Sequence, residues 1–261
     1  MRPLTLLLAL SLTALPTSEA ASAPLQPTGK WIVDFDDAQC VASLSYGEEQ
    51  LFLKASPLGD VVQFGIIEPG RSGPPQQVPA EIEPASGAAY GGNALLWTAS
   101  KGEKPQRVRL INMPAAEFQR LSASPALGLK IGDMKRSYAM PAMPALAKVM
   151  KTCVDDLQKV WTSEGGVSAK AVANLASYFS DDDYPAESVR NELSGTTGFV
   201  LLIDETGRVA DCMVTQTSGQ AGLDSQSCAI VKRRARFTPA RDSAGKPTKD
   251  RVTSRVVWRL P

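Results

Sequence analysis

The four cysteines are the residues whose chemistry the sequence defines best. They stand at positions 40, 153, 212 and 228 in a chain of 261 residues that contains no histidine. No Cys-x-x-Cys motif is present, and the usual zinc ligand sets need histidine or paired cysteines. Four cysteines are typical of two disulfides if a chain is exported, and they can pair in three ways. We expect Cys40–Cys153 and Cys212–Cys228, because each pair then stays within one predicted domain, and we expect no metal site.

Acidic side chains are the other candidates, because acid–base catalysis without histidine would need carboxylates or lysines. Three adjacent pairs occur: Asp36-Asp37, Glu48-Glu49 and Asp155-Asp156. Neighbouring residues point to opposite faces of a strand and diverge by about 100° on a helix, so no pair converges by itself. Gly-x-Ser-x-Gly and a phosphate-binding glycine loop are missing from the sequence. We therefore expect no catalytic residue and no cofactor, with an exported enzyme as an alternative.

Residues 1–20 have the pattern of a secretory signal peptide. Arg2 precedes an apolar stretch from Leu4 to Leu15, and small residues follow up to Ala20. That stretch is shorter than the roughly 20 residues that span a bilayer, so cleavage after Ala20 is expected. The mature chain should then be soluble and exported, and the alternative is an uncleaved membrane anchor. The formal net charge of +1 gives no reason to expect nucleic acid as a partner.

Residues 24–162 are predicted to form a β-rich domain. Short runs of β-branched and aromatic residues are separated there by Gly and Pro, as is typical of strands and turns. The expected strands are 31–35, 40–44, 50–54, 61–67, 95–98 and 107–113. The stretch 70–79 is rich in Pro, Gly and Gln, so we expect a long exposed loop, and a short helix should run from 114 to 121.

A longer helix over 144–161 is predicted to close this domain. Its apolar residues recur at steps of three and four. They are Leu146, Val149, Met150, Cys153, Leu157 and Val160. This face places Cys153 toward the core, where Cys40 on a strand can meet it. Residues 163–183 should then form a linker, with a possible short helix over 168–179 and three aspartates at 181–183 that act as exposed linker or helix cap.

Residues 184–261 are predicted to form a small β-β-α-β domain, which makes the whole chain α+β. The apolar run 197–203 is expected to be a strand buried on both faces. A turn at Glu205-Thr206-Gly207 leads to a strand over 208–215 that places Ala210, Cys212 and Val214 on one face, and a helix over 223–234 follows. In the last strand Val252, Ser254, Val256 and Trp258 alternate with Arg251, Thr253, Arg255 and Val257, the pattern of a half-exposed strand.

The order of short motifs in this segment resembles the C-terminal domain of TonB-family energy transducers, over about residues 175–261. The motifs are Tyr184-Pro185, Asp204-x-x-Gly207-Arg208-Val209, Ser218-Gly219, Leu223-Asp224, Arg236-Phe237-x-Pro239-Ala240 and Gly245-x-Pro247. No single motif is specific, and their order and spacing together carry the resemblance. It implies a β-β-α-β domain in the periplasm of a Gram-negative bacterium. Residues 24–162 resemble no family that we can name.

The resemblance also implies binding of a short extended segment from an outer-membrane receptor. An exposed sheet edge offers unpaired N–H and C=O groups, which an added peptide strand satisfies. The candidate partner-binding residues are Tyr184, Pro185, Arg251, Thr253, Arg255, Val256 and Val257. The alternative is that the inward residues of the last strand only pack the core and that the edge is covered.

Three departures from the family argue against force transduction. A transducer keeps an N-terminal anchor with a histidine that couples to a proton-driven motor, and a long Pro-rich spacer crosses the periplasm. This chain has no histidine, a cleavable leader and a predicted folded domain in place of the spacer. We therefore expect a periplasmic protein that binds an extended segment of an envelope protein, such as a TonB-dependent outer-membrane receptor. The alternative is a TonB-type energy transducer whose anchor stays uncleaved.

Overall fold

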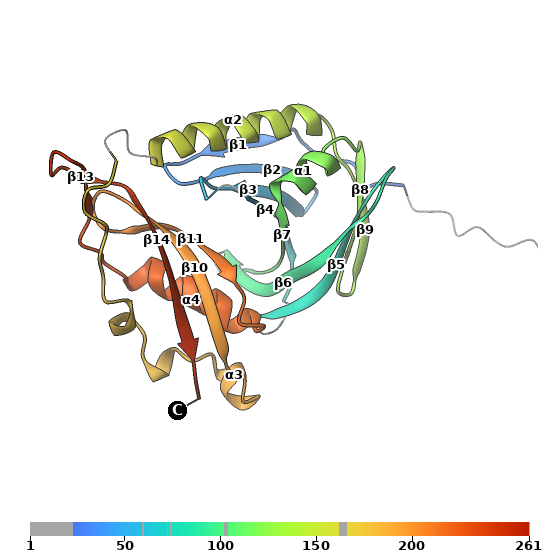
Figure 1. Ribbon diagram of the computed structural model, residues 1–261. Coiled ribbons are helices and arrows are strands. Elements are labelled where there is room, and N and C mark those ends of the chain that lie inside the picture. The colour runs from blue at the N-terminus through green and yellow to red at the C-terminus, as the bar shows by residue number, and fades with distance from the viewer. Residues whose placement is uncertain are drawn as a thin grey trace, which may run out of the picture.

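The computed structural model describes residues 23–58, 60–71, 73, 75–101, 104–161 and 166–260. Two main antiparallel sheets with covering helices make up this part of the chain, which confirms the predicted α+β class (Figure 1). The predicted signal peptide, residues 1–20, lies outside the described residues. Within the described ranges, none of the helices combines the length and apolar character that crossing a bilayer requires.

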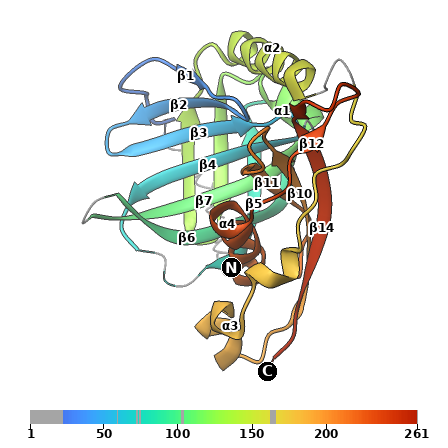
Figure 2. The ribbon, with the colours of Figure 1, turned by 90° about the vertical axis from the view of Figure 1, so that its left-hand side faces the viewer.

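The N-terminal sheet has the strand order β1-β2-β3-β4-β7-β6-β5-β8-β9 and curls around a buried core (Figure 1, Figure 2). Its strands are β1 (Ile32–Phe35), β2 (Cys40–Tyr46), β3 (Glu49–Ala55), β4 (Val61–Pro69), β5 (Gln76–Pro84), β6 (Tyr90–Lys101), β7 (Lys104–Pro114), β8 (Ala126–Ile131) and β9 (Met134–Ala139). The segment before β1 links the two ends of this sheet. Leu25 forms a bridge with Tyr138 on β9, and the N–H of Thr28 donates to the carbonyl of Ser45 on β2 at 2.8 Å.

Two helices follow strands of this sheet, as the sequence predicts. They are α1 (Ala115–Leu121) and α2 (Met143–Trp161), and α2 lies across β2 (Figure 1). Leu146 and Met150 of α2 are buried against the core, whereas Val149 and Val160 remain 44% and 54% exposed. The expected disulfide Cys40–Cys153 is present and joins α2 to β2.

The sheet has more strands than the sequence pattern predicts. β5 begins inside the stretch expected to be a loop, and β8 and β9 are additional. β5 was not predicted because proline is normally excluded from a strand that pairs on both sides. Pro79 fits here because the pairing of β5 with β8 begins only at Ala80. The glycine at position 132 is the sequence feature that could have indicated the turn between β8 and β9. It has a φ of 57°, and a tight hairpin requires a positive φ at such a position.

The C-terminal sheet has the order β11-β10-β14, so that β10 is central. The strands are β10 (Gly195–Ile203), β11 (Val209–Gln216) and β14 (Asp250–Trp258), and α4 (Ala221–Arg234) covers one face (Figure 1). A short ribbon of β12 (Ala240–Arg241) and β13 (Pro247–Thr248) precedes β14. The expected disulfide Cys212–Cys228 is present and joins β11 to α4.

Both faces of β10 are buried, as its apolar run predicts. Phe199 and Leu201 belong to the cluster that packs under α4. Leu202 points the other way, is fully buried and packs with Trp161 and Leu58 of the N-terminal part of the chain. The second cover of the C-terminal sheet is therefore the end of α2 together with the turn after β3.

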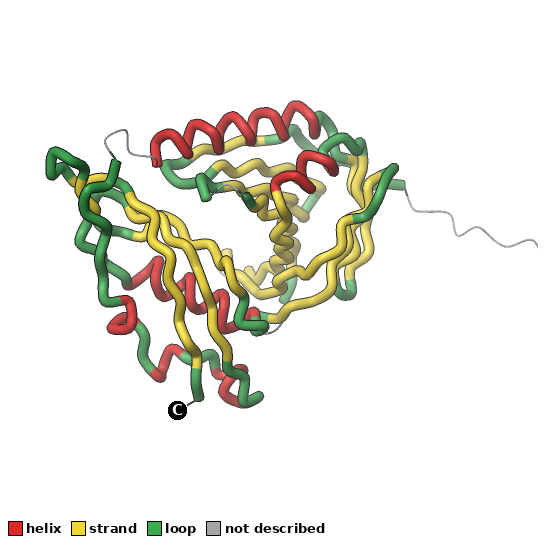
Figure 3. Tube along the Cα trace, viewed as in Figure 1, coloured by secondary structure: helices red, strands yellow, loops and turns green. Residues whose placement is uncertain are grey.

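Two local predictions for this half of the chain are wrong. Residues 168–179 are mostly extended, because Ala169 and Val172 pair with Arg241 and Thr238, and only Leu175–Tyr178 form a helical turn (Figure 3). Backbone pairing within the tertiary structure replaces the expected helix. Ala210 does not share a face with Cys212, because a β-bulge at this position turns it toward the cluster that contains Leu202.

Candidate functional site

β14 forms one border of the C-terminal sheet (Figure 2). In the described part of the chain it pairs with β10 only, over the full register from Asp250 opposite Ile203 to Trp258 opposite Gly195. Its exposed residues are Arg251, Thr253, Arg255 and Val257, which confirms the predicted alternation. Among the described residues, the outer side of this strand therefore has no neighbouring strand, and the N–H of Arg251 donates to Asp250 Oδ1 at 2.8 Å.

The two ends of β14 are fixed, and the middle is open. At the start, the buried carboxylate of Asp250 accepts hydrogen bonds from the N–H of Ala171 and from Lys170 Nζ, both at 2.9 Å. At the end, Trp258 Nε1 donates to Ser227 Oγ of α4 at 3.0 Å. Sequence reasoning did not identify this role of Asp250, and no local pattern points to it, since its partners lie about 80 positions away.

Arg251 differs from the other exposed residues of β14. Its Nη2 donates to the carbonyl oxygen of Pro57 at 2.7 Å, across to the turn after β3. Arg255 has no ion-pair partner among the described residues, and Val257 is 49% exposed. Of the four predicted outward residues, Arg251 is therefore already engaged, whereas Thr253, Arg255 and Val257 remain accessible.

Val256 points inward, with the half-buried side of the strand. It packs against the buried cluster of Leu223, Ile230 and Trp258. This packing agrees with the alternative for the inward residues, and the partner-binding role of Val256 stays a prediction.

Tyr184 contacts the last residue of β14, and Pro185 follows Tyr184 in the chain. The ring of Tyr184 packs edge to face against Trp258, with 5.3 Å between the ring centroids, and its hydroxyl donates to the carbonyl of Leu193 at 2.6 Å. Burial raises the pKa of this hydroxyl above its ordinary value. Pro185 immediately precedes α3 (Ala186–Arg190). Tyr184 therefore supports the end of the strand through Trp258.

Asp183, the last of the three aspartates before Tyr184, caps and anchors this segment. Asp183 Oδ2 accepts a hydrogen bond from the N–H of Ser180, as in a capping box, and a further one from the Ser180 hydroxyl. The same oxygen pairs with Arg234 Nη1 at 2.6 Å, and this hydrogen bond holds the pKa of Asp183 below its usual value. Asp181 and Asp182 stay exposed.

The adjacent acidic pairs are separately engaged. Asp36 Oδ1 accepts the N–H groups of Ala38 and Gln39, which stabilises a turn. Glu49 binds Arg136 and the hydroxyl of Tyr138, and Asp155 pairs with Lys151 of the same helix at 2.7 Å. Among the described residues, no cluster of three or more His, Cys, Asp or Glu could hold a metal ion.

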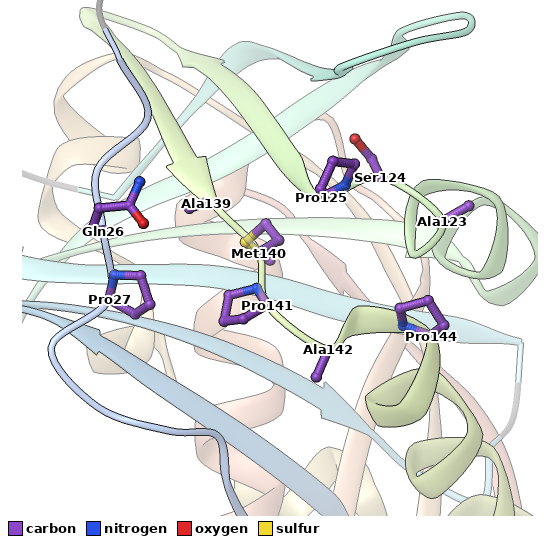
Figure 4. Close-up of a pocket in the computed structure, with 10 residues that line it drawn as sticks. All are labelled: Gln26, Pro27, Ala123, Ser124, Pro125, Ala139, Met140, Pro141, Ala142 and Pro144. Atoms are coloured by element: carbon purple, nitrogen blue, oxygen red, sulfur yellow. The ribbon is translucent and has the colours of Figure 1, made fainter.

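A cavity of about 430 Å³ lies where the segment before β1 passes the end of β9 (Figure 4). Pro27, Pro141 and Pro144 contribute much of its wall, and none of its lining residues is charged. Its one hydroxyl, Ser124 Oγ, donates to the carbonyl of Ala126 and accepts the N–H of Ala85. This cavity therefore presents no activated nucleophile or general base.

The comparisons with known proteins bear on the C-terminal sheet. Residues 181–260 match the family model of the Gram-negative bacterial TonB protein C-terminal domain. No curated protein and no solved structure matches the chain. The matched range contains β10, β11, α4 and β14, and it confirms the resemblance seen in the motifs. The chain therefore carries a TonB-family C-terminal domain over residues 181–260.

Proposed function

We propose that this protein binds an extended peptide segment of an envelope partner, which adds as a strand to the outer edge of β14. The observation that supports the proposal is the pairing of β14 on one side only, with fixed ends and an open middle. A peptide beside residues 251–257 would satisfy the outward N–H and C=O groups and extend the sheet. A TonB-dependent outer-membrane receptor is the partner that the family suggests.

The accessible side chains of β14 would favour some peptide sequences over others, in addition to the backbone pairing. Thr253, Arg255 and Val257 lie on one face of β14, opposite α4. Every second side chain of the added strand would lie beside them. An acidic residue of the peptide opposite Arg255 would gain a partner that this cation otherwise lacks among the described residues.

The proposal locates this binding in the periplasm and treats residues 24–162 and 184–261 as two domains. Residues 1–20 would direct export and be removed after Ala20. N-terminal sequencing of the exported protein tests this part, because a first residue of Ala21 is expected and an intact Met1 would favour the membrane-anchored transducer.

Photo-crosslinking in cells tests the binding edge. A benzophenone amino acid replaces Thr253 or Val257, and a matched control replaces Val149, which is 44% exposed on α2 and far from β14 in the sequence. We expect the two β14 positions to capture an envelope protein through an extended segment, identified by mass spectrometry, and the control to capture none.

A proline variant separates backbone pairing from mere proximity. Arg255→Pro removes a backbone N–H and obstructs an added strand, whereas Arg255→Ala keeps the backbone donor. With the crosslinker at Val257, capture should be lost in the proline variant and retained in the alanine variant. Equal capture by the two variants, with both folded by circular dichroism, would rule out strand addition at β14.

A further inference from the structure

A second opening follows the other border of the C-terminal sheet. This cleft has a volume of about 510 Å³ and lies between β11, α4 and the outer face of the N-terminal sheet. Ribbon views show the end of β11 directed toward β6 (Figure 1). None of the residues assigned to the β14 edge lines it.

The cleft runs along the edge of β11. Four consecutive residues of this strand, 212–215, line it. Successive side chains of a strand point to opposite faces, and β11 lies at the border of its sheet, so a cleft that meets its consecutive residues passes along that border. In the described part of the chain, β11 pairs with β10 only. Its outward N–H and C=O groups therefore face the cleft.

The opposite wall is an apolar surface of the N-terminal sheet. Leu95 on β6 pairs in register with Leu110 on β7, and Trp97 follows two residues along β6. All three line the cleft and are half-buried. Leu95 and Leu110 lie on the face opposite the core, since the adjacent residues Ala94 and Ile111 belong to the core cluster, and the buried Leu96 also lines the cleft. Side chains of an extended ligand would find apolar contacts here.

The remaining lining residues indicate which ligand charge fits the cleft. Among the described residues, Asp224 is the one charged residue that lines the cleft. Its carboxylate is already bound by Thr197 Oγ1 at 2.8 Å, by the N–H of Ser218 at 2.8 Å and by Thr217 Oγ1. The side-chain amides of Gln77 and Asn93 also line it, and both residues are exposed. A neutral ligand with amide groups matches this wall, because a charged one would find no free counter-charge.

The edge of β11 is held in place before any ligand arrives. Cys212 is joined to Cys228 of α4, and the neighbouring Asp211 pairs with Lys54 of β3 at 3.3 Å. These links fix the strand to the helix and to the N-terminal sheet. A preformed edge lowers the entropy that binding a flexible segment costs.

We propose that this cleft is a second peptide-binding site, which takes an uncharged, apolar extended segment along the edge of β11. The segment would pair with residues 212–215, place apolar side chains against Leu95, Leu110 and Trp97, and direct backbone groups toward Gln77 and Asn93. The site is separate from the β14 edge, so that each can be present without the other.

Nuclear magnetic resonance of the ¹⁵N-labelled mature chain tests the site. The probe is a pool of capped hexapeptides built from Val, Leu, Thr and Asn. We expect saturable shifts of the backbone amides of 212–215 and 95–97. Trp97→Ala should weaken binding about tenfold, whereas Phe35→Ala, which truncates an exposed aromatic residue of β1, should leave the affinity unchanged.

Leu95→Arg serves as a second variant, because it adds a charge to the apolar wall without touching the core. It should also weaken binding, provided that its amide spectrum keeps the native pattern. The proposal is overturned if the pool does not bind, if shifts are confined to 251–257, or if Trp97→Ala and Leu95→Arg bind as the native chain does.

Discussion

Arg251 and Pro57 connect the two sheets through one hydrogen bond, from Nη2 of Arg251 to the carbonyl oxygen of Pro57 at 2.7 Å. Pro57 is buried and precedes Leu58, which packs against Leu202 of β10. The strand that we propose as the peptide acceptor is therefore tied at its beginning to the N-terminal part of the chain. A peptide on β14 would extend from this tie toward Val257.

Loss of the hydrogen bond between Arg251 and Pro57 should lower the stability of the fold modestly. Arg251→Ala removes a charged donor from the carbonyl of Pro57, and we expect the free energy of unfolding to fall by about 1 kcal/mol. Arg255→Ala on the same strand is the control and should change it by less than about 0.5 kcal/mol. Urea unfolding measures both. Equal values for the two variants would mean that the Arg251 contact contributes nothing in solution.

Gly207 should tolerate no side chain. Its φ is 81°, and an added Cβ would lie 2.0 Å from the carbonyl oxygen of Phe237. Gly207→Ala should therefore cost on the order of 3 kcal/mol or prevent folding of the C-terminal sheet. Gly245→Ala is the matched control, because Gly245 has a φ of 77° and nothing within 4 Å of the added Cβ. Thermal unfolding should show only about 1 kcal/mol of loss for the control, from backbone strain alone; equal losses would contradict the predicted clash.

The two disulfides should contribute unequally to the free energy of unfolding. Cys212 and Cys228 are separated by 16 positions, and Cys40 and Cys153 by 113. On the loop-entropy description, Cys212→Ala with Cys228→Ala should cost about 3 kcal/mol, and Cys40→Ala with Cys153→Ala nearer 5 kcal/mol. Urea unfolding of the oxidised proteins gives the comparison. A larger loss for the short loop would show that effects in the folded state outweigh loop entropy.

The pair of Asp183 and Arg234 should make stability depend on pH in the acid range. Arg234 holds the pKa of Asp183 below its unfolded value of about 3.9. The carboxylate therefore stabilises the fold above about pH 4, and this contribution is lost as the pH falls through the lowered folded value.

Asp183→Asn should accordingly be less stable than the native chain at pH 7, and the difference should shrink as the pH falls below about 4. Asp182→Asn is the control, since Asp182 is exposed beside it. Urea unfolding at pH 7 and at lower pH measures the difference. A constant difference across this range would exclude the ion pair as its cause.

Local patterns predicted the elements that have a clear period. The alternation from Arg251 to Trp258 predicted a half-exposed strand, and the steps of three and four over 144–161 predicted α2. Both periods follow from backbone geometry alone. The pattern of β5 was missed because Pro79 is normally excluded from a paired strand, and only the point at which β8 begins pairing explains why it is accepted.

The sequence by itself determined most strands of the N-terminal sheet, the TonB-like order of motifs and the half-exposed last strand, and it left three cysteine pairings, of which the expected one is present. Tertiary structure decided which surfaces remain open. Leu202 could be recognised as buried, but only the folded chain shows that Trp161 and Leu58 cover it. Likewise, Arg251 and Arg255 are equivalent in the alternating pattern, and they differ because Pro57 lies within reach of one of them. Such contacts join residues far apart in the sequence, where no local period can encode them.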